Sequence, residues 1–186
     1  MDSTSVTLLE RVKARSDADA WERLVALITP LLRDWARWLG ADEEDAEDLV
    51  QEVMAVLVVK LPEFSYDRDK SFRGWLRTIA TNIWRGWQRR RGAIALEDAG
   101  LEDRAGDDPA EEFWEQEFRE RLVGLALKIM RRDFEPTTWK ACWESVAMGR
   151  AAAEVAAELG ISRGAVYVAT SRVLKRLRAE LAEMME

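Results

Sequence analysis

Residues 151–181, AAAEVAAELGISRGAVYVATSRVLKRLRAEL, decide the fold of the C-terminal part of this chain. Ala156 stands four positions before Gly160, and Val166 follows six positions after that glycine. A small residue lets two helices cross closely, a glycine can take the left-handed conformation of a tight turn, and Ser162 can cap the helix that follows. The spacing predicts a helix-turn-helix, whose core would be closed by Val155, Leu159, Ile161 and Val166.

The second helix of this pair is predicted to have one apolar and one basic face, because an α-helix turns about 100° per residue. The apolar face carries Val166, Ala169, Val173 and Leu177. The opposite face carries Gly164, Val168, Ser171, Arg172 and Lys175. Residues 163–178 hold five lysines and arginines and no acid, so the outward face suits contact with DNA.

Such a helix can lie in the major groove of a DNA duplex. We expect Arg172 or Lys175 to reach guanine edges or phosphates. Ser162 and Arg163 would meet the sugar-phosphate backbone, and Tyr167 flanks this surface. The alternative is an amphipathic helical hairpin whose basic face is merely solvated. The pattern indicates DNA binding without identifying the kind of DNA-binding protein.

Helical spacing continues upstream, and no segment alternates apolar and polar residues as a strand would. Gly40 would end a first long helix, Asp42 would cap the next, and Pro62 would close it. Residues 63–70 would form a loop, and Gly92 would stop a third helix. The apolar residues that set this pattern are Trp21, Leu24, Val25, Ile28, Leu31, Leu32, Trp35, Ala46, Leu49, Val50, Val53, Leu57, Phe72, Leu76, Ile79, Ala80 and Ile83.

The linker between two domains is predicted from composition. Residues 93–110 are acidic, interrupted by glycine and poor in large apolar side chains, so they would form a flexible linker. We therefore predict an all-α chain of two small helical domains, with the first in residues 1–92 and the second, which contains the helix-turn-helix, in residues 111–186. Further helices are expected over 111–130, 137–148, 151–159 and 162–184.

The composition makes several classes of function improbable. The 186 residues include a single cysteine and no histidine, so the chain has no internal disulfide and lacks the commonest zinc ligand and general base. We expect no enzyme activity, no metal and no cofactor. Cys142 lies among Trp139, Trp143 and Val146, and we interpret it as buried packing rather than a redox sensor. With no long apolar segment and no leader pattern, we expect a soluble cytoplasmic protein without membrane insertion.

Charge is sorted along the chain, although the net charge is −7. Residues 42–52 hold seven acids and no base, and residues 67–91 hold eight bases against two acids. Asp45, Asp48 and Glu52 fall on one helical stripe, which is either a docking surface for a basic partner or an ordinary solvated face. The segment from Phe64 to Trp75 mixes aromatic rings with cations, which suits unpaired bases and phosphates. The alternative is that these rings belong to the core.

Taken in order, DAEDLVQEV, then LPEFSYDRDKSFRGWLRTIATN, then a basic cluster, an acidic linker and the helix-turn-helix resemble the extracytoplasmic-function (ECF) class of bacterial RNA polymerase sigma factors. The likeness spans about residues 18–181. It implies a sigma factor that binds RNA polymerase core, recognises −35 and −10 promoter elements and promotes DNA melting. The implied partners are the core enzyme, promoter DNA and an anti-sigma factor.

The resemblance also implies a role for each segment. The first domain would dock on the clamp helices of the largest polymerase subunit through Asp45, Asp48, Leu49, Gln51 and Glu52. A loop around Phe64, Ser65 and Tyr66 would capture a flipped base of the −10 element. The residues implied beside that loop and along the phosphates are Arg73, Trp75, Arg77, Asn82, Arg85, Arg89 and Arg90. The second domain would bind the −35 duplex through the outward face already derived, which comprises Ser162, Arg163, Tyr167, Val168, Ser171, Arg172 and Lys175.

Two other functions compete with this interpretation. An ordinary helix-turn-helix regulator would use its front domain to sense a signal or to dimerise. A metal-dependent nuclease would use Asp42, Asp45 and Asp48 as oxygen ligands for Mg²⁺, although carboxylates on one helix lack the convergent ligands of such a site. The sequence names neither a promoter nor an inducing signal.

Overall fold

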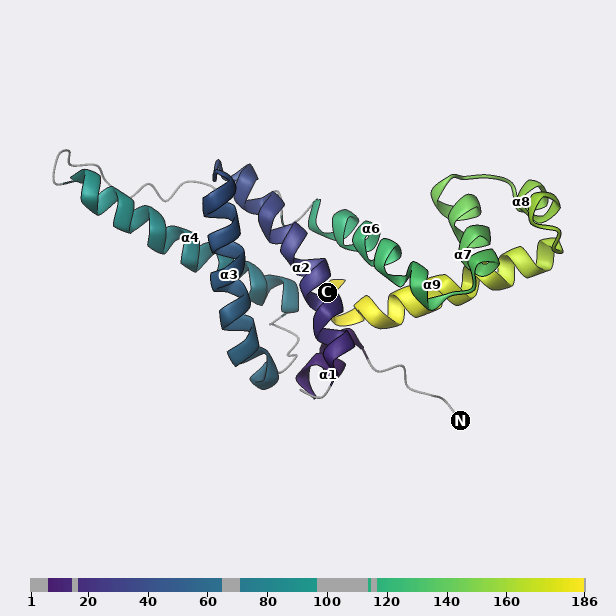
Figure 1. The fold of residues 1–186 in the computed structure, drawn as a ribbon, viewed down its shortest axis with the longest axis horizontal. Coiled ribbons are helices and arrows are strands. Elements are labelled where there is room, and N and C mark those ends of the chain that lie inside the picture. Colours follow the sequence, from purple (N-terminus) through teal and green to yellow (C-terminus); the bar gives the residue numbers. More distant parts are fainter. Residues whose placement is uncertain (1–6, 15–16, 65–70, 97–113, 115–116, 186) are drawn as a thin grey trace. The chain divides into compact units, whose positions relative to one another are not determined.

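The computed structural model describes residues 7–14, 17–64, 71–96, 114 and 117–185, and every regular element in these ranges is helical (Figure 1). The predicted all-α class is confirmed. The chain divides into two compact units, whose bodies are Leu8–Leu122 and Val123–Ala182.

The N-terminal unit is a helical assembly in which α3 packs against both α2 and α4 (Figure 1). Its elements are α1 (Leu8–Lys13), α2 (Ala18–Trp38), α3 (Glu43–Lys60), the 3-10 turn η1 (Leu61–Glu63) and α4 (Phe72–Leu96). The predicted apolar stripes form most of the core, which includes Leu24, Ile28, Leu31, Leu32, Trp35, Ala46, Leu49, Val53 and Leu57. Val25 is an exception, because its side chain is 42% exposed. The short helix α1 was not predicted.

The predicted helix ends around residues 39–62 are confirmed. Gly40 follows the end of α2 with a φ of 87°, a conformation that favours glycine. The Asp42 carboxylate accepts a hydrogen bond from the Asp45 backbone N–H at 2.8 Å and so caps α3. Pro62 lies in η1, immediately after α3. Local turn chemistry therefore sets these boundaries.

The predicted stop at Gly92 is wrong, because α4 continues to Leu96. A glycine inside a helix costs about 1 kcal/mol relative to alanine, but it ends a helix only when it adopts the left-handed conformation of a cap. The left-handed glycines among the described residues are Gly40, Gly149 and Gly160.

Trp114 packs in the N-terminal unit, close to the start of α6 (Phe118–Met130). Its side chain is 1% exposed, and its ring lies 6.0 Å from that of Trp35 and 4.9 Å from that of Phe118. Arg121 adds an ion pair with Asp34. The helix expected over 111–130 is described from Phe118 onward. Residues 93–96, the first four of the predicted linker, belong to α4, so a linker can begin only after Leu96. Residues 97–113 lie outside the described residues, so the rest of the linker and the start of the second domain stay predictions.

The C-terminal unit includes the end of α6, the 3-10 turn η3 (Arg131–Asp133), α7 (Pro136–Cys142), the π-helical turn η4 (Trp143–Ala147), α8 (Ala152–Leu159) and α9 (Arg163–Met185). Its core contains Ala141, Val155, Ala156, Val166 and Ala169, with Leu159 and Ile161 packed against it. Every residue predicted to close this core is therefore part of it. The helix expected over 137–148 is an α-helix only up to Cys142.

Cys142 is buried, as predicted, beside Trp139 and Val173. Burial raises the pKa of its thiol, which keeps the sulfur protonated and poorly reactive. This environment favours a packing role for Cys142 over redox sensing.

Candidate nucleic-acid interface

The turn between α8 and α9 has the predicted chemistry. Gly160 has a φ of 66°, and the Ser162 hydroxyl accepts a hydrogen bond from the Ala165 backbone N–H at 3.1 Å. Ala156 is 5% exposed within the core that joins the two helices. These features fix the first turn of α9 and therefore the direction of its outward face.

The outward face of α9 is exposed, whereas its apolar face is buried. Val166, Ala169, Val173 and Leu177 are between 0% and 6% exposed. Tyr167 and Val168 are 60% and 58% exposed, although both side chains are largely apolar. The other exposed residues of the predicted DNA contact are Ser162, Arg163, Ser171, Arg172 and Lys175. The whole predicted −35 set thus lies on the surface, with cations beside apolar groups suited to thymine methyls.

The acidic stripe of α3 is only partly free. Asp48, Gln51 and Glu52 are exposed, but the carboxylate of Asp45 is held by Arg91 of α4. The hydrogen bonds from Arg91 lower the pKa of Asp45 from its ordinary value. Leu49 is wrong as a surface contact, because its side chain is fully buried in the core. Its side chain packs in the core below the exposed acidic residues of α3.

A shallow groove of about 250 Å³ brings the acidic stripe next to the basic end of α4. It is lined by Asp45, Asp48, Glu52, Trp87, Arg90 and Arg91. The Trp87 indole N–H donates a hydrogen bond to Glu52 Oε1 at 3.2 Å, which orients that carboxylate. Sequence reasoning missed this function of Trp87, because a link across 35 positions leaves no local pattern.

Part of the aromatic segment belongs to the core, as the alternative interpretation held. Phe72 is fully buried, while Phe64 and Trp75 are half-buried. The rings of Phe64 and Trp75 stack with centroids 4.7 Å apart, and the Lys13 ammonium lies 5.2 Å from the centroid of Phe64. Ser65 and Tyr66 lie outside the described residues.

The arginines of α4 fall into two groups. Arg73 is half-buried and donates a hydrogen bond to the backbone carbonyl of Trp114 at 2.8 Å, so its guanidinium is engaged within the protein. Arg77 is also half-buried. Further along the helix, Asn82, Arg85, Arg89 and Arg90 are exposed. Asn82, Arg85 and Arg89 follow a spacing of three and four residues, which places them along one side of α4.

The structure weakens the nuclease interpretation. The Asp42 carboxylate caps α3, and that of Asp45 binds Arg91, so both are already engaged within the protein. No group of three or more His, Cys, Asp or Glu side chains suited to a metal occurs among the described residues. Within the same residues, no helix is long and apolar enough to cross a membrane.

Comparison with known proteins identifies the family. Residues 24–94 match Sigma-70 region 2. The RNA polymerase sigma factor NccH of Alcaligenes xylosoxydans xylosoxydans is 32% identical over 180 residues, which cover 93% of this chain and 92% of NccH. The ECF RNA polymerase sigma factor SigF of Caulobacter vibrioides is 31% identical over 167 residues, which cover 87% and 85%. This chain belongs to the ECF class of RNA polymerase sigma factors.

Two further proteins are similar over most of the chain. The ECF RNA polymerase sigma factor SigE of Mycolicibacterium smegmatis is 26% identical over 183 residues, which cover 98% of this chain and 69% of SigE. The sigma factor RpoE, solved in complex with the anti-sigma factor NepR from Bartonella quintana, aligns with 85% of this chain at 23% identity and a TM-score of 0.36.

Proposed function

We propose that this sigma factor docks on RNA polymerase core through α3 and presents α4 and α9 to promoter DNA. The observation that carries the proposal is the separation of exposed charge between helices. Asp48 and Glu52 of α3 form an acidic surface in one unit, and the exposed face of α9 in the other unit is basic. An acidic surface suits a basic protein partner and repels DNA, whereas a basic surface binds phosphates.

On the N-terminal unit, Asp48, Gln51 and Glu52 would contact the clamp helices, with Leu49 supporting them. Arg85, Arg89 and Arg90 of α4 would follow the phosphates of the −10 region, since these side chains are exposed and positive. Phe64 stacks on Trp75 of the same helix, and this pair of rings would border the captured base. Arg73 and Arg77 would position this region rather than bind DNA directly.

On the C-terminal unit, α9 would enter the major groove of the −35 element. Arg172 and Lys175 supply cations for guanine edges or phosphates, and Val168 supplies an apolar contact for a thymine methyl. Ser162 and Arg163 lie at the start of the helix, where contacts to the DNA backbone usually fall.

We further propose that the protein performs no covalent chemistry. The binding free energy from core enzyme, duplex contacts and captured bases would offset the few kcal/mol needed to unstack the promoter. The site of action would be the cytoplasm, where core polymerase acts, and an anti-sigma factor would be a third partner. The acidic linker that follows α4, within residues 97–110, would enter the polymerase, where it would imitate nucleic acid.

The test is run-off transcription with purified bacterial core enzyme and a promoter pool, with and without the full chain. We expect chain-dependent transcripts whose templates share an upstream and a downstream element. A folded chain that supports no transcript with its cognate core would instead favour the helix-turn-helix regulator.

A further inference from the structure

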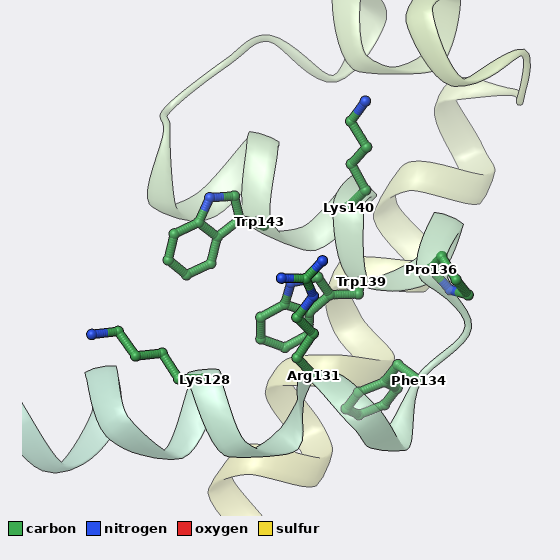
Figure 2. Close-up of a pocket in the computed structure, with 7 residues that line it drawn as sticks. All are labelled: Lys128, Arg131, Phe134, Pro136, Trp139, Lys140 and Trp143. Atoms are coloured by element: carbon green, nitrogen blue, oxygen red, sulfur yellow. The ribbon is translucent and has the colours of Figure 1, made fainter.

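A pocket of about 590 Å³ opens in the C-terminal unit beside α7 and lies outside both proposed interfaces (Figure 2). Its volume falls within the range of small-molecule sites, which is roughly 300–1,000 Å³. The residues that line it are Lys128, Arg131, Phe134, Pro136, Trp139, Lys140 and Trp143. None of them belongs to the predicted −35 set, so the proposed function leaves this pocket without a role.

The aromatic side of the pocket is an array of nearly parallel rings. The rings of Trp139 and Trp143 are 24° from parallel with centroids 6.1 Å apart, and those of Phe134 and Trp139 are 27° from parallel at 6.4 Å. Trp139 is fixed in the core beside Cys142, whereas Trp143 is only half-buried. Aromatic side chains of this kind stack nucleobases without strong preference among them.

The charge around these rings is positive, and the lining residues that the structure describes include no acid. Lys140 is engaged, because its ammonium binds Glu158 Oε1 at 2.8 Å and points away from the rings (Figure 2). Lys128 and Arg131 are exposed and stand three positions apart near the end of α6. Figure 2 shows the Arg131 guanidinium beside Trp139 and the Lys128 ammonium extending away from the rings. The Arg131 guanidinium suits a phosphate group, and the flexible Lys128 side chain would turn toward the same group.

The backbone at the pocket is also unusual. Trp143 begins the π-helical turn η4, which is closed by a hydrogen bond from the Met148 backbone N–H to the Trp143 carbonyl at 3.1 Å. The Ser145 hydroxyl of this turn donates a hydrogen bond to the Ala141 carbonyl of α7 at 2.6 Å. Single π-helical turns are rare and are frequent at functional sites. The turn therefore adds an observation that is independent of the lining side chains.

We propose that this pocket binds a free nucleoside phosphate, with the base stacked on Trp143 and the phosphate held by Arg131 and Lys128. A nucleotide uses both the flat aromatic surface and the cations. An acidic amphipathic peptide would use the charge and bury aliphatic side chains against the rings, but only a planar base matches the flat stacking surface.

The test is calorimetric titration of the full chain with guanosine and adenosine diphosphates. Guanosine alone and inorganic pyrophosphate serve as the half-ligands. We expect each diphosphate to bind at least about tenfold more tightly than either half-ligand, because stacking and phosphate contacts act together. We expect Arg131→Gln and Trp143→Leu each to weaken diphosphate binding by about tenfold. Arg119→Gln, which removes an exposed arginine outside the pocket and outside both proposed interfaces, should leave that binding unchanged.

Arg131→Gln removes an exposed side chain and little packing, so it remains informative even if Trp143→Leu unfolds. Pyrophosphate binding as tight as diphosphate binding would overturn the proposal, as would equal losses in Arg131→Gln and Arg119→Gln. It would also be overturned if a single-stranded oligonucleotide or an acidic helical peptide bound at this site and the diphosphates did not. Run-off transcription by Arg131→Gln without added diphosphate tests the proposed sigma function separately from diphosphate binding. Failure of the pocket proposal can therefore be distinguished from failure of the proposed sigma function.

Discussion

Arg91 of α4 donates two hydrogen bonds to the carboxylate of Asp45 on α3, one of them with Nη1 and Oδ2 2.6 Å apart. The pair links the acidic stripe proposed to meet polymerase with the basic helix proposed to meet promoter DNA. It lowers the pKa of Asp45 and raises that of Arg91, because each charge favours the ionised form of the other. One carboxylate of the stripe is therefore already paired with a cation in the free protein.

Arg91→Gln should raise the pKa of Asp45 toward its ordinary value of 3.8. A carboxyl group whose pKa is lower in the folded than in the unfolded state stabilises the protein at a pH above the unfolded-state pKa. This stabilisation is lost as the pH falls through the folded-state pKa. The measurement is a carboxyl ¹³C NMR titration of Asp45. Arg163→Gln, which alters an arginine in the other unit, should leave the Asp45 curve in place. An unchanged curve in Arg91→Gln would show that another group depresses this pKa.

Asp48→Arg should weaken binding to core polymerase by about tenfold or more and spare binding to an isolated −35 duplex. Arg172→Ala should do the reverse, because its side chain lies on the exposed face of α9. Core binding is measured by competition with a labelled sigma factor, and duplex binding by fluorescence anisotropy. Glu22→Arg makes the same change of charge at an exposed site outside the stripe and serves as the control. Equal losses in both assays would refute the division of labour.

Lys175→Ala and Val168→Ser should separate phosphate contact from base recognition. Lys175→Ala removes one phosphate contact, so the slope of log K against log salt should become less negative by about 1. Its affinity should fall by about the same factor for every duplex sequence. Val168→Ser should keep the slope and reduce the preference for thymine, because the exposed apolar side chain would no longer meet the methyl group. Anisotropy over a salt series, with a duplex set that varies each −35 position, reports both effects. The idea fails if Val168→Ser changes the slope and Lys175→Ala does not.

Gly160→Ala should destabilise the protein by about 1–2 kcal/mol, because alanine is strained at the φ of 66° that this turn requires. Gly124→Ala is the matched control. Gly124 lies inside α6 with no atom within 4 Å of an added Cβ, so alanine there should stabilise by up to about 1 kcal/mol. Urea denaturation followed by circular dichroism measures both. The same sign of change in the two variants would contradict the assigned roles.

Glu158 should make the C-terminal unit sensitive to acid. Its carboxylate binds Lys140 at 2.8 Å and Arg150 at 2.6 Å, and these contacts lower its pKa from 4.5 to about 2. The stability that this group supplies is therefore present above pH 4.5 and is lost as the pH falls toward 2. We expect the urea midpoint of Glu158→Gln to be lower than that of the wild type above pH 4.5 and to approach it as the pH falls toward 2. Parallel curves would show that Glu158 is not the responsible group.

Local chemistry allowed much of the fold to be predicted. Helical periodicity gave the core residues of α2, α3 and α9, because one face of each helix must be apolar to be buried. The caps at Asp42 and Ser162 and the turn at Gly160 were also predictable, since each depends on residues within a few positions. The order of these parts was enough to indicate the sigma-factor family.

Tertiary structure alone decided which functional groups are free to act. Leu49 is buried, Asp45 is bound to Arg91, and Arg73 is bound to the Trp114 carbonyl 41 positions away. The pocket beside Trp139 and Trp143 depends on how α7 packs near the end of α6. The sequence by itself determined the helices, their faces and the turn of the DNA-binding motif, because those follow from neighbours along the chain. Only the packed structure could decide which charges remain available, because pairing depends on distances between residues that sequence spacing does not contain.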